Sequence, residues 1–268
     1  MSTPTEDPQL QPLLLLNLPL WKKAVLLFLG SAIFLISFIT FIGWIIQSPL
    51  LVIPFPQLYA MAYSTSILMM SSGLYIIFRT LLFNKTSYFL LVFLLIASTI
   101  GSLDILFGTG HLIEDLFIHP EWQLPIPYQY RPAANTMFSL FGLSLSLLSL
   151  RNFYLSPLLI WIASLILTLI LLFTLTTLYG YLEGVERSTL SFDASRMAFS
   201  TALCFLLNCI ALLPIAFHYS FYYPRQNGLF HMVMGFIMTI AVYSALYTSW
   251  KFEANQNLQL ILSSETSS

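Results

Sequence analysis

Seven long apolar runs constrain this chain more than any other feature of its sequence. An α-helix rises about 1.5 Å per residue, so about 20 apolar residues cross the bilayer core of about 30 Å. The runs are of that length, and short polar or proline-containing segments separate them. The predicted spans are 24–46, 59–78, 87–107, 133–150, 156–179, 197–217 and 229–250. We therefore predict an all-α, polytopic membrane helix bundle with about seven transmembrane helices.

The charge content agrees with a membrane protein and argues against a nucleic-acid partner. Charged residues make up 8% of the chain, whereas soluble domains carry about 25%. The net charge is −1, and the ten Lys and Arg residues form no basic stripe that would neutralise phosphates. The expected parts are a cytoplasmic or interfacial segment at 1–23, a transmembrane domain at 24–250 and a disordered tail at 251–268.

The basic residues predict the orientation, because Lys and Arg in short loops tend to stay cytoplasmic. One side of the predicted bundle collects Lys22, Lys23, Arg79, Lys85, Arg151 and Arg225. The other side has fewer basic residues, Arg131, Arg187, Arg196 and Lys251, and nearly all of the loop acids, namely Glu114, Asp115, Glu121, Glu183, Glu186 and Asp193. We predict a multi-pass protein of a bacterial inner or plasma membrane, with its amino terminus in the cytoplasm.

A short pattern of small and hydroxyl residues recurs at the start of three spans. It reads Met61-Ala62-Tyr63-Ser64-Thr65, then Pro132-Ala133-Ala134-Asn135-Thr136, then Met197-Ala198-Phe199-Ser200-Thr201. The intervals between the three Thr residues are 71 and 65 residues, which predicts a helix pair that repeats about every 70 residues. The expected architecture is three tandem helix pairs and a final helix. Pro214 is expected to kink or stop the sixth span.

These clusters allow two interpretations. Small and polar side chains let membrane helices approach closely and bond to one another, so the clusters suit helix contacts. Alternatively, the three clusters line one polar pocket for a small ligand. That pocket would be lined by Thr65, Asn135, Thr136, Ser200 and Thr201, with Arg131 and Arg196 at its mouth.

Few other residues suggest chemistry. Asp104, near the end of the third span, is a candidate for an intramembrane ion pair with Arg131 or Arg196. Cys204 and Cys209 are five residues apart on one helix, about 140° around its axis, and are expected to be buried thiols without a common partner. The four His residues match no ligand motif. No catalytic motif is found either, so we expect no enzyme activity, no metal and no cofactor.

The pattern resembles the multi-helical (MASE-like) membrane input region of bacterial sensor histidine kinases and diguanylate cyclases. Phe107-Gly108, Tyr179-Gly180-Tyr181 and, more loosely, Gly43-Trp44 are similar to its aromatic-glycine steps at the end of odd helices. Arg196-Met197-Ala198-Phe199-Ser200-Thr201-Ala202-Leu203 and the partial match Ala134-Asn135-Thr136 are similar to the start of its even helices. The resemblance covers about residues 24–217. Because no output domain follows, it implies that a separate partner carries the signal.

The first functional hypothesis is therefore a non-enzymatic sensor-input-like module. It would bind a small or lipophilic signal, or sense the state of the lipid bilayer, and act through a membrane or cytoplasmic protein partner. One alternative is a structural or assembly subunit of a larger membrane complex, which stable recovery in a stoichiometric complex would favour. Another is a small transporter built from repeats, for which uptake into proteoliposomes is the test. The sequence does not define an oligomeric state.

Overall fold

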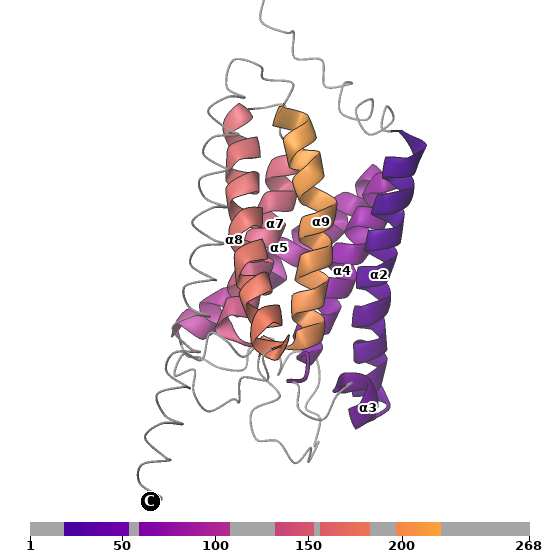
Figure 1. Cartoon of the computed structure of the whole chain (residues 1–268), viewed down its shortest axis with the longest axis vertical. Coiled ribbons are helices and arrows are strands. Elements are labelled where there is room, and N and C mark those ends of the chain that lie inside the picture. Colours follow the sequence, from indigo (N-terminus) through magenta and orange to yellow (C-terminus); the bar gives the residue numbers. More distant parts are fainter. Residues whose placement is uncertain (1–18, 54–58, 108–131, 153–155, 183–196, 221–268) are drawn as a thin grey trace, which may run out of the picture. The chain divides into compact units, whose positions relative to one another are not determined.

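The computed structural model describes residues 19–53, 59–107, 132–152, 156–182 and 197–220, and its regular structure there is entirely α-helical (Figure 1). The helices are α2 (Leu20–Ile45), the short α3 (Pro49–Val52), α4 (Tyr63–Thr80), α5 (Asn84–Phe107), α7 (Ala134–Arg151), α8 (Pro157–Leu182) and α9 (Phe199–Ser220). Six of the predicted spans correspond to long helices. The predicted span at 229–250 and the tail at 251–268 lie outside the described residues.

Some helix boundaries differ from the prediction. Helix α2 begins directly after Pro19, whose carbonyl oxygen accepts the N–H groups of Lys22 and Lys23, so these lysines lie within the first turn. Helix α4 begins at Tyr63 rather than at residue 59. Of the two effects expected of Pro214, the stop is wrong, because α9 continues through it to Ser220. A proline removes only one hydrogen bond from a helix, which neighbouring helices can compensate within a membrane.

Four helices are long and apolar enough to cross a membrane, which identifies a multi-helical membrane protein. Their spans are Leu20–Ile45, Asn84–Phe107, Leu158–Tyr181 and Phe199–His218. Helices α4 and α7 are shorter, with 18 residues each, and each carries four buried serines. Serine lowers the hydropathy of a helix, and this is tolerated where other helices surround it.

The six long helices form a ring in chain order. Each contacts the next, from α2 through α4, α5, α7 and α8 to α9, and α9 returns to contact α2. Helix α4 also contacts α7 and α9 across the ring. At one end, which we call the Trp44 end, α2, α5 and α8 finish and α4, α7 and α9 begin. The opposite end, which we call the Arg151 end, holds the termini of α4 and α7 and the start of α5.

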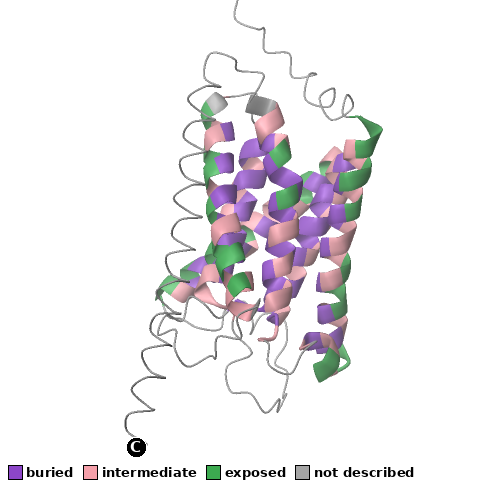
Figure 2. Ribbon diagram, in the orientation of Figure 1, coloured by how far each residue is buried: buried purple, intermediate pink, exposed green. Residues whose placement is uncertain are grey.

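Burial separates inner helices from outer ones (Figure 2). Eleven of the 18 residues of α4 and ten of the 18 of α7 are buried, against eight of the 26 in α2. The spanning window of α9 is 56% buried, whereas those of α2 and α5 are 33% buried. Helices α4, α7 and α9 therefore lie inside, and α2, α5 and α8 carry the outer surface.

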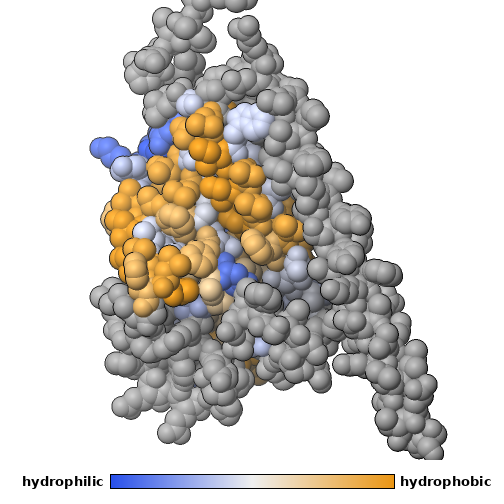
Figure 3. Space-filling model, turned by 90° about the vertical axis from the view of Figure 1, so that its left-hand side faces the viewer, coloured by the Kyte–Doolittle hydropathy of each residue, from blue (hydrophilic) through white to orange (hydrophobic). Residues whose placement is uncertain are grey.

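The outer surface is strongly hydrophobic. Large apolar side chains such as Phe28, Phe89 and Leu158 are mostly exposed. One face of the molecule is correspondingly hydrophobic over most of its height, with hydrophilic residues near its upper edge (Figure 3). In water such a surface would drive association, whereas in a bilayer it matches the acyl chains.

Candidate functional site

The three Thr residues of the recurring pattern occupy equivalent positions at the Trp44 end. Thr65, Thr136 and Thr201 lie in the first turns of α4, α7 and α9 and are 1%, 3% and 2% exposed. Just before each helix, the carbonyl oxygen of Ala62, Ala133 or Ala198 accepts the N–H of the residue four positions later, at 3.0, 3.2 and 2.9 Å. The pattern therefore begins all three inner helices in the same register.

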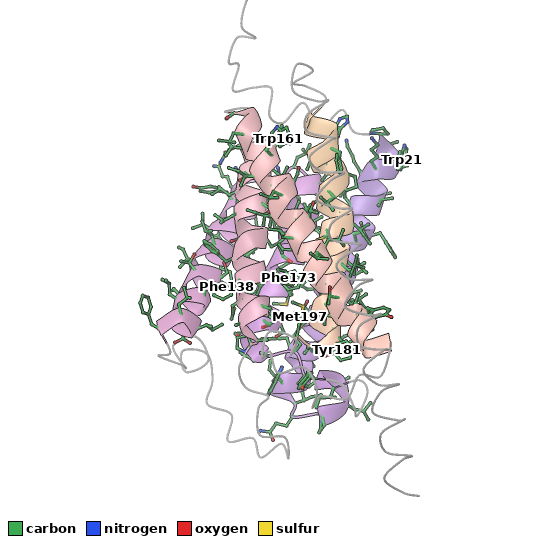
Figure 4. All side chains as sticks on the ribbon, turned by 60° about the vertical axis from the view of Figure 1, so that its left-hand side comes forward. Trp21, Phe138, Trp161, Phe173, Tyr181 and Met197 are labelled. Carbon is green, nitrogen blue, oxygen red and sulfur yellow. The ribbon has the colours of Figure 1, made fainter. Side chains whose placement is uncertain are left out.

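Two helix pairs are fastened at this end by the same contact. The Trp44 Nε1–H donates to the carbonyl oxygen of Met61 at 2.8 Å, and the Tyr181 hydroxyl donates to that of Met197 at 2.7 Å. Figure 4 labels Tyr181 and Met197. Met61 and Met197 directly precede the alanines that open α4 and α9, so their carbonyl groups lie outside the helical hydrogen bonds. The two aromatic donors satisfy these buried acceptors, which would otherwise be costly in a membrane.

Aromatic ring contacts accompany both hydrogen bonds. Phe41 stacks on Tyr63 with the ring centroids 5.3 Å apart, and Tyr181 meets Phe199 edge to face at 5.8 Å. Tyr63 and Phe199 hold the same position in the recurring pattern. We call the Trp44–Met61 and Tyr181–Met197 contacts the two clasps.

A second equivalent position lies eight residues beyond each Thr, and each time it holds a small residue at the contact with the preceding long helix. Gly73 lies against the backbone of Gly30 and Phe34, so close that a Cβ there would be 2.8 Å from the Gly30 oxygen. The Ser144 Oγ lies 3.3 Å from the Ser98 Oγ. The Cys209 thiol donates to the Leu167 carbonyl oxygen at 3.5 Å. Small residues allow such close approach of membrane helices.

Hydroxyl groups line the interior, and most of them bond within their own helix. The hydroxyl group donates to a carbonyl oxygen three or four residues earlier in the same helix. Examples are Ser37, Thr40, Ser71, Ser72, Thr80, Thr168 and Thr174. Apart from the clasps, the hydroxyl contacts between helices are longer. They include Ser102 to the Met137 oxygen at 3.3 Å, Ser146 to the Ala163 oxygen at 3.5 Å and Ser37 to Cys204 at 3.6 Å. At these distances a hydrogen bond contributes little, so the helices are held together mainly by close contact.

Several enclosed polar atoms have no hydrogen-bond partner among the described residues. They include Thr65 Oγ1, Ser164 Oγ, Asn208 Oδ1 and Arg151 Nη1. The Asn208 amide donates to the Ser72 Oγ at 3.3 Å and to the Cys204 carbonyl oxygen at 2.9 Å, linking α9 to α4 at the centre of the ring. A buried polar atom without a partner is destabilising and is a natural contact for a bound water or ligand.

Of the remaining predicted site residues, some lie at the Trp44 end and the others lie outside the described residues. Asn135 and Ser200 are half-buried beside their Thr neighbours, and Asp104 is buried near the end of α5 at the same end of the bundle. Arg131 and Arg196 lie outside the described residues, so the pairing predicted for Asp104 stays a prediction. The structure places the Thr residues at one end and in one register, and the hydrogen bonds among the described residues do not link the three Thr side chains to one another.

The two cysteines agree with the sequence analysis. Both are free and buried, and they contact different helices, since Cys204 faces Ser37 and Cys209 faces Leu167. Sequence reasoning missed the clasps and the central Asn208. Met61 and Met197 belong to the recurring pattern and Trp44 and Tyr181 follow glycines, so the residues were visible as motifs but their contacts were not.

Replacing Asn208 by leucine should leave the free energy of unfolding within about 1 kcal/mol of the parent value, or raise it. The substitution removes the unpartnered Oδ1 together with two hydrogen bonds, and Ser72 keeps its bond to the Met69 oxygen. Asn208→Asp should instead destabilise strongly, because it places a carboxylate at a fully buried position. Unfolding by sodium dodecyl sulfate in mixed micelles measures both; a large loss for Asn208→Leu would contradict this account.

No family model, curated protein or solved structure matches this chain.

Proposed function

We propose that this chain is a sensor-input-like membrane module, in which small movements between helix pairs report a small or lipophilic signal or the state of the bilayer. The observation that carries the proposal is the way the pairs are joined. Clasps fasten two pairs at the Trp44 end, while small residues allow close approach along the helices. Because most interior hydroxyls bond within their own helix, a pair can shift without breaking many polar contacts.

The buried Thr65 hydroxyl is the proposed contact for a signal. It lies in the first turn of α4 at the Trp44 end, and its oxygen has no partner among the described residues. A ligand that forms a hydrogen bond with this oxygen would bind most tightly to the helix arrangement that offers the contact. Its binding would therefore raise the population of that arrangement. Asn135, Thr136, Ser200 and Thr201 are the proposed neighbours, with Arg131 and Arg196 at the mouth. The output would be carried by a protein partner.

A cysteine pair across α5 and α7 tests the proposed movement. Ser98 and Ser144 are buried with their oxygens 3.3 Å apart, so a variant carrying Ser98→Cys and Ser144→Cys is expected to crosslink under a diffusible oxidant. A shift of about 1–2 Å would change the distance between the sulfur atoms enough to alter the rate. The rate should therefore differ between vesicles of short-chain and long-chain phosphatidylcholine.

The parent chain is the control, since Cys204 and Cys209 contact different helices and should not crosslink. Co-purification from membranes would identify the partner. An unchanged crosslinking rate in both kinds of vesicle, together with the absence of any co-purifying protein, would contradict the proposal.

We also propose the membrane topology, which consists of three tandem helix pairs, a seventh span at 229–250 and a cytoplasmic Arg151 end. The orientation is supported by the basic residues of the described segments, because Lys22, Lys23, Arg79, Lys85 and Arg151 all lie at the Arg151 end.

Lys85 provides the test of this orientation, because its side chain is exposed at the start of α5. A Lys85→Cys variant in intact bacterial cells should resist a membrane-impermeant maleimide and react fully once the membrane is permeabilised. The buried native cysteines give the background. Complete labelling in intact cells would reverse the proposed orientation.

A further inference from the structure

Two arginines from different helices come together at the Arg151 end. Arg79 lies in the last turn of α4 and Arg151 in the last turn of α7, and 72 positions separate them in the sequence. Both reach the first turns of α5, where Arg79 bonds to Asn84 and Arg151 lies over the ring of Tyr88. We call Arg79, Asn84, Tyr88 and Arg151 the Arg79–Arg151 cluster.

The neighbours of each arginine fix its position without neutralising its charge. Arg79 Nη1 donates to Asn84 Oδ1 at the start of α5. The Arg151 guanidinium lies over the Tyr88 ring, 4.9 Å from its centroid. An amide oxygen and an aromatic face orient a cation but carry no full negative charge. The cluster is therefore preorganised and still positive.

A carboxylate that could neutralise the cluster is missing from the described segments. Asp104, the one acidic residue there, lies 20 residues further along α5, about 30 Å away at 1.5 Å per residue. In addition, Arg151 Nη1 is buried and has no hydrogen-bond partner in the described part of the chain. Two like charges and an unused buried donor raise the energy of this arrangement unless an anion occupies it.

The geometry points to a phosphate group, and we propose that the Arg79–Arg151 cluster binds the phosphate of an anionic phospholipid headgroup. Guanidinium groups donate parallel hydrogen bonds that match phosphate oxygens, and paired arginines are a recurrent arrangement for that purpose. The cluster lies at the ends of helices whose outer partners span the bilayer, at the level where headgroups are found. The amino terminus of α5 adds to the positive potential there through the helix dipole.

The test uses the full chain in phosphatidylcholine nanodiscs with increasing phosphatidylglycerol. Native mass spectrometry counts retained phosphatidylglycerol, and thermal unfolding measures the stabilisation. Arg79→Gln and Arg151→Gln should each weaken phosphatidylglycerol binding about tenfold or more, because each removes charge-assisted hydrogen bonds. Lys85→Gln is the matched control, since Lys85 lies at the same end with an exposed side chain, and it should retain the parent affinity.

Folding of each variant is first checked in phosphatidylcholine alone, because Arg151 also contacts the Tyr88 ring. If Arg151→Gln does not fold, Arg79→Gln and Arg151→Lys still decide the result. Arg151→Lys keeps the positive charge but loses the paired donors of the guanidinium, so phosphatidylglycerol binding should weaken. Equal losses for Lys85→Gln and Arg79→Gln would overturn the proposal in favour of diffuse surface attraction. Stabilisation by inorganic phosphate in phosphatidylcholine, without an effect of phosphatidylglycerol, would overturn the lipid assignment and identify a free anion as the ligand.

Discussion

Replacing Trp44 by alanine should lower the free energy of unfolding by about 3–5 kcal/mol. Trp44 is 4% exposed and closes the clasp to the Met61 carbonyl oxygen. Its removal leaves both a cavity between α2 and the start of α4 and a buried carbonyl without its donor. Unfolding by sodium dodecyl sulfate in mixed micelles gives the free energy directly.

Three further substitutions separate the effect of the cavity from the effect of the lost hydrogen bond. Trp44→Phe keeps most of the ring but loses the donor, so it should cost about 1–3 kcal/mol. Tyr181→Phe removes the equivalent donor to Met197 and should cost a similar amount. Trp21→Ala is the matched control, because Trp21 lies on the same helix but is 65% exposed, and it should change stability by less than about 0.5 kcal/mol. Equal losses for Trp44→Ala and Trp21→Ala would rule out the clasp.

Replacing Gly73 by alanine should destabilise the bundle by about 1–3 kcal/mol. The new Cβ would lie 2.8 Å from both the Gly30 oxygen and the Phe34 nitrogen. These are backbone atoms, so α2 and α4 can relieve the overlap only by moving apart. Alanine is otherwise favoured over glycine in a helix by about 1 kcal/mol, so the observed loss would understate the steric effect.

Two other glycines make this a graded series. At Gly142 the added carbon would lie 2.9 Å from the Ile166 Cγ2 methyl, which is a side-chain rather than a backbone atom, so Gly142→Ala should cost less than Gly73→Ala. At Gly180 nothing lies within 4 Å, so Gly180→Ala should be neutral or stabilising. The same micelle assay ranks the three. A loss for Gly180→Ala as large as that for Gly73→Ala would show that α2 and α4 do not approach closely.

The sequence predicts the helices well because run length and hydropathy are local properties. Six apolar runs correspond to six long helices, yet the start of α4 shifts from residue 59 to Tyr63. That boundary depends on the Met61 carbonyl, which bonds to a side chain from α2 rather than to its own helix. Trp44 and Met61 are 17 residues apart, so their contact produces no local periodicity from which the boundary could be predicted.

The candidate site is only partly readable from sequence for the same reason. The recurring pattern identifies Thr65, Thr136 and Thr201, and the structure shows that all three are buried. The contact partners Gly30, Ser98 and Leu167 depend on how each helix is rotated about its axis, which hydropathy alone does not fix. Arg79 and Arg151 likewise appear in the sequence as single charges at helix ends, and only the fold brings them together.

The hydroxyl groups that bond to their own helix also bear on how the chain can be made. A newly synthesised helix that enters lipid alone has no neighbours to satisfy its polar side chains. Thr80, Thr168 and Thr174 need none, because the acceptor of each lies one turn earlier in the same helix. Individual hairpins can therefore leave the insertion machinery one at a time and assemble later, with few hydroxyl groups, such as those of Thr65 and Ser164, left without an acceptor in their own helix.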